Sequence, residues 1–262
     1  MSVRIAIAGG NGRMGRTLID LVQQGDDLEL AGVSLAPGED VPSPPPAPAE
    51  LYHHDIAAAI AGADVLIDFT TPAAARLHAE ACATAGVAWV LGTTGMDSAD
   101  QEVVDKAAQH IAVCQAANFS TGVNLMLRLV ELAAAAVDGE TDLEVIEAHH
   151  RHKVDAPSGT ALAIGEALAR GRGIDLDAHA VMSREGITGA RPDGAIGFAT
   201  IRGGDIVGEH TALFASEGER IEMTHKAGTR LAFARGACRA ARWLASRPAG
   251  RYDMQDVLNL RD

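Results

Sequence analysis

Residues 3–22 read VRIAIAGGNGRMGRTLIDLV, and this stretch decides the class of fold that the sequence predicts. The apolar run Val3–Ala8 predicts a strand, and Arg16 begins an apolar pattern of helical period. Between the two, three glycines have the G-x-G-x-x-G spacing: Gly10, Gly12 and Gly15. Glycines in this context permit a tight turn and let backbone N–H groups approach a pyrophosphate at the helix N-terminus. A purely structural turn would give the same match, so the signal needs support from the rest of the chain.

The first half of the chain alternates short apolar runs with Ala-rich helical stretches. The predicted strands are Val3–Ala8, Leu28–Val33, Val65–Phe69, Val87–Leu91 and Ile111–Gln115. Such a β-α-β alternation is typical of a parallel, doubly wound sheet. The proline-rich residues 41–48 predict an extended surface loop without chemistry.

After about residue 120 the rhythm changes, because three predicted strands follow one another without intervening helices. They are Gly197–Arg202, Ile206–Phe214 and Arg220–Lys226, after an earlier strand at Leu143–Ala148. Closely spaced strands favour an antiparallel or mixed sheet. The prediction is an α/β fold with two domains. Residues 1–120 with 230–262 would form a Rossmann-like parallel-sheet dinucleotide-binding domain, and residues 121–229 an α+β domain with an open mixed sheet.

Composition narrows the classes of function. The formal net charge of -13 would repel nucleic-acid phosphates, so no nucleic-acid partner is expected. No window approaches the roughly 18 apolar residues of a membrane span, and the amino terminus has no signal-peptide pattern. Three widely spaced cysteines fit reduced thiols rather than a disulfide framework, which favours a cytoplasmic protein. They are Cys82, Cys114 and Cys238.

Small polar clusters follow three of the predicted strands. They read Asp68-Phe69-Thr70-Thr71-Pro72, Gly92-Thr93-Thr94-Gly95 and Ala116-Ala117-Asn118-Phe119-Ser120. Each cluster alone fits turn chemistry or a helix cap equally well. Because ligands of open parallel sheets bind beyond the carboxyl ends of the strands, the three together predict one binding crevice.

The residues after the second strand leave the choice of nicotinamide cofactor open. An acidic residue usually stands there and accepts the ribose 2′-hydroxyl, but this strand runs into Ser34-Leu35-Ala36-Pro37. No Lys or Arg lies between Arg16 and Arg76 to hold a 2′-phosphate, and Arg13 in the glycine loop is the remaining nearby cation. The pattern favours NADH, or the use of both NADH and NADPH.

The most informative segment is residues 147–160, which read EAHHRHKVDAPSGT. If the preceding strand continues into it, alternation puts His149, Arg151 and Lys153 on one face. Ser158 then caps a helix whose free N–H groups offer an anion site. Such an arrangement suits a small substrate with carboxylates, with His or Lys left to transfer the proton that a hydride acceptor needs.

Two other interpretations of this segment stay open. The cationic run can be a solvated charge cluster, and His150 and His152, two apart on a strand, can share a metal ion. No cysteine or further histidine stands at a convincing spacing for such a site. We therefore expect no metal.

Taken in this order, the motifs resemble those of the 4-hydroxy-tetrahydrodipicolinate reductase family, formerly called dihydrodipicolinate reductases. The resemblance rests on the glycine loop, the three polar clusters and residues 147–160. It continues in Gly197-Phe198-Ala199-Thr200, Gly208-Glu209-His210-Thr211 and Thr224-His225-Lys226-Ala227, and so covers nearly the entire chain. It implies an oxidoreductase of diaminopimelate and lysine biosynthesis, in which NADH or NADPH reduces 4-hydroxy-tetrahydrodipicolinate, a small dicarboxylate, with loss of water to give tetrahydrodipicolinate.

The resemblance also implies roles for individual residues. The residues that match the family's proton-handling pair are His149 and Lys153, and those that match its substrate-binding residues are His150, Ser158, Gly159 and Thr160. The family's cofactor contacts carry over to Gly9, Gly10, Asn11, Gly12, Arg13, Met14, Gly92, Thr93, Thr94, Ala116, Ala117, Asn118 and Phe119. Residues 121–229 would bind substrate and assemble a homotetramer through their sheet. Many members carry an acidic residue, often followed by Arg, where this chain has Leu35-Ala36-Pro37.

Two other functions stay open on the sequence. Another Rossmann-type NAD(P)-dependent dehydrogenase, acting on a different small carboxylate or sugar, would keep the glycine loop but would not predict residues 149–160. A non-catalytic dinucleotide sensor would bind the cofactor without turnover.

Overall fold

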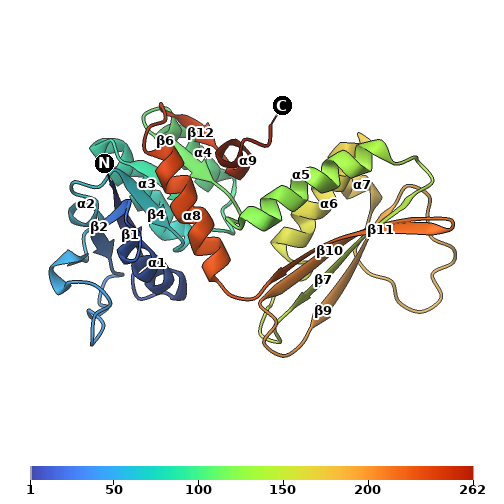
Figure 1. Cartoon of the computed structure of the whole chain (residues 1–262), viewed down its shortest axis with the longest axis horizontal. Coiled ribbons are helices and arrows are strands. Elements are labelled where there is room, and N and C mark those ends of the chain that lie inside the picture. Colours follow the sequence, from blue (N-terminus) through green and yellow to red (C-terminus); the bar gives the residue numbers. More distant parts are fainter. Residues whose placement is uncertain (1, 262) are drawn as a thin grey trace. The chain divides into compact units, whose positions relative to one another are not determined.

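The computed structural model describes residues 2–261, which form two compact units. The first unit contains the chain up to Thr121 and from Arg230 onward, and the second contains Gly122–Thr229. The first unit is therefore discontinuous in sequence, with the second inserted into it (Figure 1). Each unit has its own sheet and its own buried core. Among residues 2–261, no helix is both long and apolar enough to cross a bilayer.

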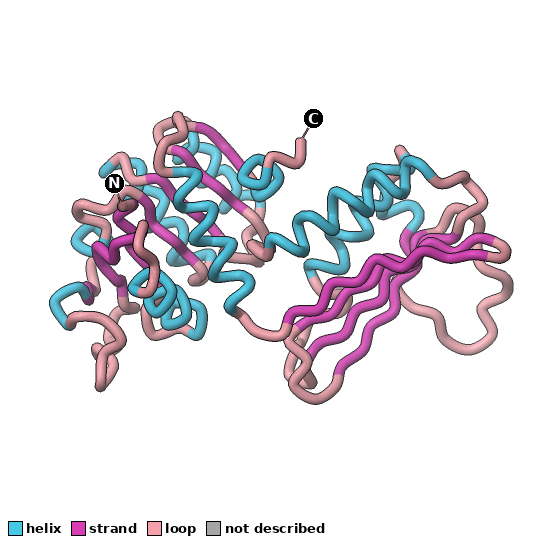
Figure 2. Tube along the Cα trace, in the orientation of Figure 1, coloured by secondary structure: helices cyan, strands magenta, loops and turns pink. Residues whose placement is uncertain are grey.

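A seven-stranded sheet forms the centre of the first unit, in the order β12-β6-β5-β4-β1-β2-β3. Figure 2 shows its strands in magenta, with helices in cyan beside them. Its strands are β1 (Val3–Ala8), β2 (Leu28–Ser34), β3 (Tyr52–His53), β4 (Val65–Asp68), β5 (Ala88–Leu91), β6 (Ala112–Gln115) and β12 (Gly250–Tyr252). All neighbouring strands run parallel, as the β-α-β alternation predicts.

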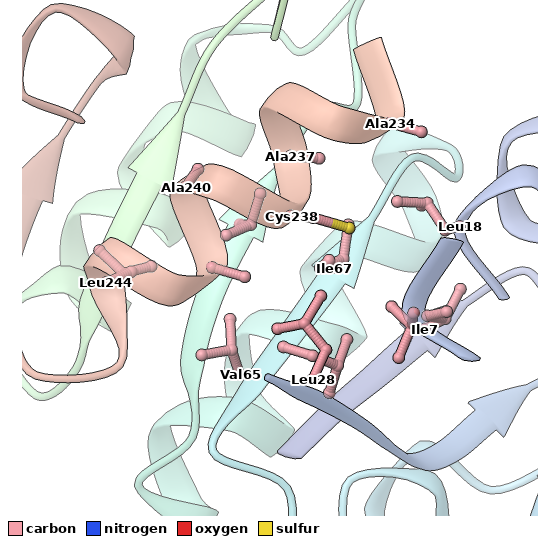
Figure 3. Close-up of a cluster of buried hydrophobic side chains, with 14 of the residues drawn as sticks. Ile7, Leu18, Leu28, Val65, Ile67, Ala234, Ala237, Cys238, Ala240 and Leu244 are labelled. Atoms are coloured by element: carbon pink, nitrogen blue, oxygen red, sulfur yellow. The ribbon is translucent and has the colours of Figure 1, made fainter. Parts of the chain in front are cut away.

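Helices cover both faces of this sheet. They are α1 (Arg13–Gln23), α2 (Ile56–Ala59), α3 (Pro72–Ala85), α4 (Ser98–Ala108), α8 (Leu231–Leu244) and α9 (Met254–Leu258), with the 3₁₀ turn η1 (Ala49–Leu51). Successive side chains of β1 point to opposite faces. Ile7 packs in the core under α1 and α8, and Ala6 packs in the core under α3 and α4. Figure 3 shows the first of these cores, with Leu18 of α1 and Ala237 of α8 over the sheet.

The second unit holds a five-stranded mixed sheet in the order β11-β10-β7-β9-β8. Its strands are β7 (Asp142–His149), β8 (Ala180–Val181), β9 (Ile196–Arg202), β10 (Gly208–Ser216) and β11 (Glu219–Ala227), and its helices are α5 (Thr121–Ala136), α6 (Gly159–Arg172) and α7 (Leu176–His179). β10 is antiparallel to β7 and β11, and β9 is parallel to β7 and β8. Every second residue of β7 is buried, so Leu143 and Val145 pack with α5 and α6.

The predicted fold class is confirmed, with a Rossmann-like parallel sheet and a separate mixed sheet. The strand predicted to begin at Ile206 begins at Gly208 and extends to Ser216. Several elements were not predicted: β3, β8, β12, α2, α7 and α9. Each has five residues or fewer, which is too short to show a hydrophobic period.

The packing of α8 against the loop after β6 leaves no room for a side chain at Gly236. A Cβ there would lie 1.7 Å from the carbonyl oxygen of Phe119. We expect Gly236→Ala to lower the free energy of unfolding by about 1–3 kcal/mol, because the helix must shift away from the sheet. Urea unfolding measures this. Gly25→Ala is the control, since its Cβ would meet nothing closer than 3.6 Å; equal stability of the two variants would contradict the prediction.

Candidate active site

The glycine loop after β1 is closed so tightly that side chains are excluded from it. Gly9 has a φ of +71°, and a Cβ at Gly15 would lie 2.2 Å from the Gly9 carbonyl oxygen. A Cβ at Gly10 would lie 2.2 Å from Val33 of β2. Gly12 caps α1 without a side-chain hydrogen bond, so the first N–H groups of the helix have no cap. A loop of this form fits a pyrophosphate.

The other predicted cofactor residues follow β5 and β6. Because all strands of this sheet are parallel, their carboxyl ends lie at the same edge as the glycine loop. Gly92 lies against Phe69, where a Cβ would come within 2.2 Å of the ring. Phe69 in turn packs edge-on against Phe119, with ring centroids 5.5 Å apart. The structure thus brings the loops after β4, β5 and β6 together.

A buried carboxylate, Asp68, ties these loops to one another. It accepts hydrogen bonds from the backbone N–H and hydroxyl of Thr70, at 2.9 and 2.6 Å, and from the Thr93 hydroxyl at 3.4 Å. Its other oxygen lies 2.7 Å from Nδ1 of His78 on α3. Burial alone would raise the pKa of Asp68, but the bonds from His78 and Thr70 outweigh it and hold that pKa below its usual value.

A cavity of about 920 Å³ opens beside the glycine loop within the first unit. Of the predicted cofactor residues, Gly9 and Gly12 line it. Glu39 and His54 also line it, together with Leu77 and other apolar side chains of α3, and the sequence analysis missed all of these. The sequence analysis found no acidic residue directly after the second strand, and the structure adds that a turn brings Glu39 back to Ala36, close to the end of β2. The Pro37-Gly38 pair was the signal for that turn.

In the second unit the centre of the site is Glu147 on β7, whose side chain is 1% exposed. Its two oxygens accept hydrogen bonds from both terminal nitrogens of Arg202, at 2.9 and 2.8 Å. It also accepts the Ser158 backbone N–H at 3.2 Å, and its Oε2 forms a short contact with Nδ1 of His149. The bonds from Arg202 and His149 outweigh burial and hold the pKa of Glu147 below its usual value.

The contact with Glu147 fixes the orientation and tautomer of His149. Burial lowers the pKa of His149, and the nearby charges of Lys153 and Arg202 lower it further, against the opposing effect of Glu147. The ring is therefore neutral at pH 7, with Nδ1–H donated to the carboxylate and Nε2 left as an acceptor.

His210 of β10 lies beside this pair, with its ring centroid 5.0 Å from that of His149. Its Nε2 lies 3.0 Å from the Ser158 hydroxyl, which also caps α6 by accepting the Ala161 N–H at 3.2 Å. Its Nδ1 is buried without a partner. Burial lowers the pKa of His210 to about 4, and repulsion from His149 when that ring is protonated contributes to the shift.

Residues 150–153 form a turn rather than a continuation of the strand, so the predicted alternation past His149 was wrong. β7 ends at His149, and Lys153 N–H donates to the His150 carbonyl at 3.1 Å. Arg151 N–H donates to the Gly204 carbonyl at 3.2 Å, which ties the turn to the β9–β10 loop. The Lys153 ammonium lies 2.8 Å from the Asp155 carboxylate.

The predicted substrate residues lie around the start of α6. Ser158 is buried and caps the helix, and Gly159 is exposed with open space where a Cβ would be. Thr160 follows in the first turn of the helix. His150 keeps a buried Nδ1 without a hydrogen-bond partner. Open space beside a capped helix start, next to histidines and Lys153, can accept a carboxylate.

Within residues 2–261, the group of side chains close enough to hold a metal ion is Glu147, His149 and His210, whose ligand atoms lie within 4.8 Å of one another. Arg202 already occupies both carboxylate oxygens, and its charge opposes a second cation there. The alternative pair, His150 and His152, has ring centroids 6.3 Å apart.

Arg202 and His210 had no role in the sequence analysis. They are far from residues 147–160 in the chain and reach Glu147 and Ser158 only through strand register, which pairs Arg202 with His149 and His210 with Glu147. His210 stands in one of the quoted motifs, and the burial of alternate residues in β10 is the signal that could have turned it inward.

Comparison with known families gives two adjoining matches. The N-terminal domain of dihydrodipicolinate reductase matches residues 3–119, and its C-terminal domain matches residues 122–258. The chain is 54% identical over 269 residues to 4-hydroxy-tetrahydrodipicolinate reductase from Alkalilimnicola ehrlichii, covering 99% of this chain and 100% of the relative. It is 53% identical over 268 residues to the enzyme of the same description from Thiobacillus denitrificans, covering 100% of both.

Among solved structures, the chain resembles a dipicolinate-bound dihydrodipicolinate reductase from Paenisporosarcina sp. TG-14. The TM-score is 0.80 and the identity 28%, covering 98% of this chain and 99% of that one.

The low pKa of His210 predicts how stability depends on pH. Between pH 4 and pH 6.5 the unfolded chain holds a proton on this histidine and the folded chain does not, so the free energy of unfolding rises with pH in this window. A shift from 6.5 to about 4 corresponds to about 3 kcal/mol. We expect the stability difference between the wild type and His210→Gln to grow by that amount from pH 4 to pH 6.5 and to stay level above pH 7. Urea unfolding at each pH measures it, and parallel curves would contradict it.

Proposed function

The chain belongs to the dihydrodipicolinate reductase family, and from this premise we propose which of its residues carry the reaction. The activity of the family is the NADH- or NADPH-dependent reduction of (2S,4S)-4-hydroxy-2,3,4,5-tetrahydrodipicolinate to (S)-2,3,4,5-tetrahydrodipicolinate, with loss of water, in diaminopimelate and lysine biosynthesis. The chain is accordingly an oxidoreductase. When bound, the dinucleotide supplies the hydride.

The glycine loop and the loops after β5 and β6 bind the dinucleotide in this proposal. The pyrophosphate would lie on the uncapped start of α1, against residues 9–14. Residues 92–94 and 116–119 would complete the site at the same sheet edge. The close packing of Gly9, Gly10 and Gly15 supports this, because it holds the backbone N–H groups in place before the ligand arrives.

The start of α6 and the turn before it bind the substrate in this proposal. One carboxylate would accept hydrogen bonds from the first N–H groups of α6 at Gly159 and Thr160, with Ser158 beside it. His150 would donate to a second polar group of the substrate. The structural relative that binds dipicolinate supports a small dicarboxylate as ligand.

His149 and Lys153 would divide the proton transfers between them. His149 has a lowered pKa and a free Nε2, so it removes a proton from the ring carbon beside the imine. Lys153, as an ammonium, protonates the neighbouring hydroxyl, which leaves as water. The bound dinucleotide would supply its hydride at the carbon that lost the hydroxyl, and His149 returns its proton to the first carbon. Lys153 takes a proton from solvent, so the sum is one hydride and one proton added and one water lost.

The observation that carries this proposal is the set of hydrogen bonds at Glu147, which hold the neutral His149 beside the start of α6 and near Lys153. The test is substrate-dependent oxidation of NADH, and separately of NADPH, by the purified protein when dipicolinate synthase supplies the substrate. Rapid oxidation with either cofactor supports the assignment. Binding of dinucleotide without oxidation would favour the sensor, and turnover with other carboxylates alone would favour a different dehydrogenase.

We also propose a homotetramer, assembled through the sheet of the second unit. β11 is a nine-residue edge strand with one side unpaired within the described chain, and such edges invite pairing. Ile201 and Ile221 leave 52% and 48% of their surface exposed on this sheet. Sedimentation equilibrium tests the proposal, and a monomer at micromolar concentration would overturn it.

A cytoplasmic location is proposed from the cysteines. Cys82, Cys114 and Cys238 are all buried and unpaired, as is usual for proteins kept in a reducing compartment. Fractionation of cells that produce the protein tests this, and recovery outside the cytoplasm would overturn it.

We expect Lys153→Met to lower kcat by about 10² to 10⁴-fold, since the leaving hydroxyl loses its proton donor. Arg151→Met is the matched control, because Arg151 is an exposed cation two residues away in the same turn. Steady-state assays at saturating cofactor measure both. A similar loss in both variants, or none in Lys153→Met, would contradict the role of Lys153.

A further inference from the structure

The chain after β2 reverses direction in a turn that returns a carboxylate to the end of the strand. Glu39 N–H donates to the Ala36 carbonyl at 3.1 Å, which closes the four-residue turn. Pro37 and Gly38 stand at its two central positions, and Gly38 has a φ of +82°, as a type II turn requires. The Glu39 side chain then accepts the Ala36 N–H at 3.1 Å. Two reciprocal hydrogen bonds therefore join Ala36 and Glu39, and one of them holds the carboxylate.

The same carboxylate is held against the glycine loop. Nδ2 of Asn11 donates to Oε2 of Glu39 at 3.4 Å and to the Asp40 carbonyl at 3.0 Å. Oδ1 of Asn11 is buried without a hydrogen-bond partner. Glu39 thus lies near the end of β2, beside the glycine loop, and both Glu39 and this loop line the cavity.

The charge around this cavity is negative. Three carboxylates line it, from Glu39, Asp55 and Glu80. Among the described residues that line it, none is a lysine or an arginine. The apolar part of the wall includes Ile56 and Leu77, and such a wall suits a flat adenine ring. A ribose with free hydroxyls fits beside a carboxylate, whereas a 2′-phosphate would meet the negative charge of these carboxylates.

We infer that Glu39 accepts hydrogen bonds from the 2′-hydroxyl of the adenosine ribose and makes this chain prefer NADH to NADPH, an inference that rests on the dinucleotide site proposed above. No acidic group stands at Leu35 or Ala36, directly after β2. The Pro37-Gly38 turn supplies one instead, because it brings the Glu39 carboxylate back to Ala36. Glu39 is therefore the residue that sets cofactor specificity.

The test measures binding, so that it does not depend on turnover. Calorimetry with NADH, NADPH, 5′-AMP and adenosine 2′,5′-bisphosphate gives the affinity of the whole protein for the ribose with and without the phosphate. We expect the wild type to bind NADH at least about tenfold more tightly than NADPH, and Glu39→Gln to shift that ratio toward NADPH by about tenfold or more. The two nucleotides without nicotinamide should show the same shift.

Two further variants separate the contact from general charge. Glu39→Asp keeps the charge on a shorter side chain, so NADH affinity should fall while NADPH stays weak. Glu80→Gln removes a carboxylate from the same cavity wall and should change the ratio less than about twofold. Thermal melting confirms that each variant is folded.

The possible failures are distinguishable. Equal binding of NADH and NADPH by the wild type, or an unchanged ratio in folded Glu39→Gln, would overturn the role of Glu39 and leave the dinucleotide site intact. An equal shift in Glu80→Gln would also overturn it, since general charge would then explain the preference. Absence of binding for either dinucleotide would overturn the proposed function together with this inference.

Discussion

A carboxylate that is removed from water needs opposite charge and hydrogen bonds to replace its hydration, and the second unit is organised around this demand at Glu147. Arg202 reaches it from the end of β9, His149 from its own strand and the Ser158 N–H from the start of α6. Strand, neighbouring strand and helix are thereby joined at one point. Loss of that carboxylate would leave the half-buried guanidinium of Arg202 and the buried imidazole of His149 without their anionic partner.

The first unit is likewise organised around a buried, hydrogen-bonded carboxylate. Asp68 is fully buried at the end of β4 and holds His78 of α3, Thr70 of its own loop and Thr93 of the next loop. In each unit a buried acid therefore fixes the loops or turns to which ligand contacts are assigned. Groups that are already in position lose less conformational entropy when a ligand binds.

Local signals in the sequence were enough for the parallel sheet, the glycine loop and the start of α6. Each of these depends on residues that are close together in the chain, such as the glycine spacing or the cap at Ser158. Arg202 and His210 were beyond such reasoning, because they come to the site through the register of β9 and β10 against β7. No pattern within residues 147–160 contains that register.

The prediction for residues 150–153 was wrong for a related reason. The alternation of residues predicted a longer strand. β7 ends at His149, where its neighbour β9 also ends and the β9–β10 loop begins, and Gly203 N–H of that loop donates to the His149 carbonyl at 2.9 Å. Glu39 was missed because in the sequence it stands beyond the position directly after the strand, and only the turn brings its carboxylate back toward the end of β2. In both cases a hydrogen bond to a distant or reversed segment outweighs the local pattern.

The discontinuity of the first unit has a consequence for how a growing chain acquires its fold. α8 contributes Ala234, Ala237 and Leu244 to the core under the parallel sheet, and these residues are made after the whole of the second unit. A nascent chain therefore carries six strands of that sheet with one face still lacking this helix. The inserted unit, being continuous, has all its packing partners sooner and can complete its structure first. A ribosome that stalls before residue 230 would leave an apolar sheet face exposed, which is the feature that chaperones and proteases recognise.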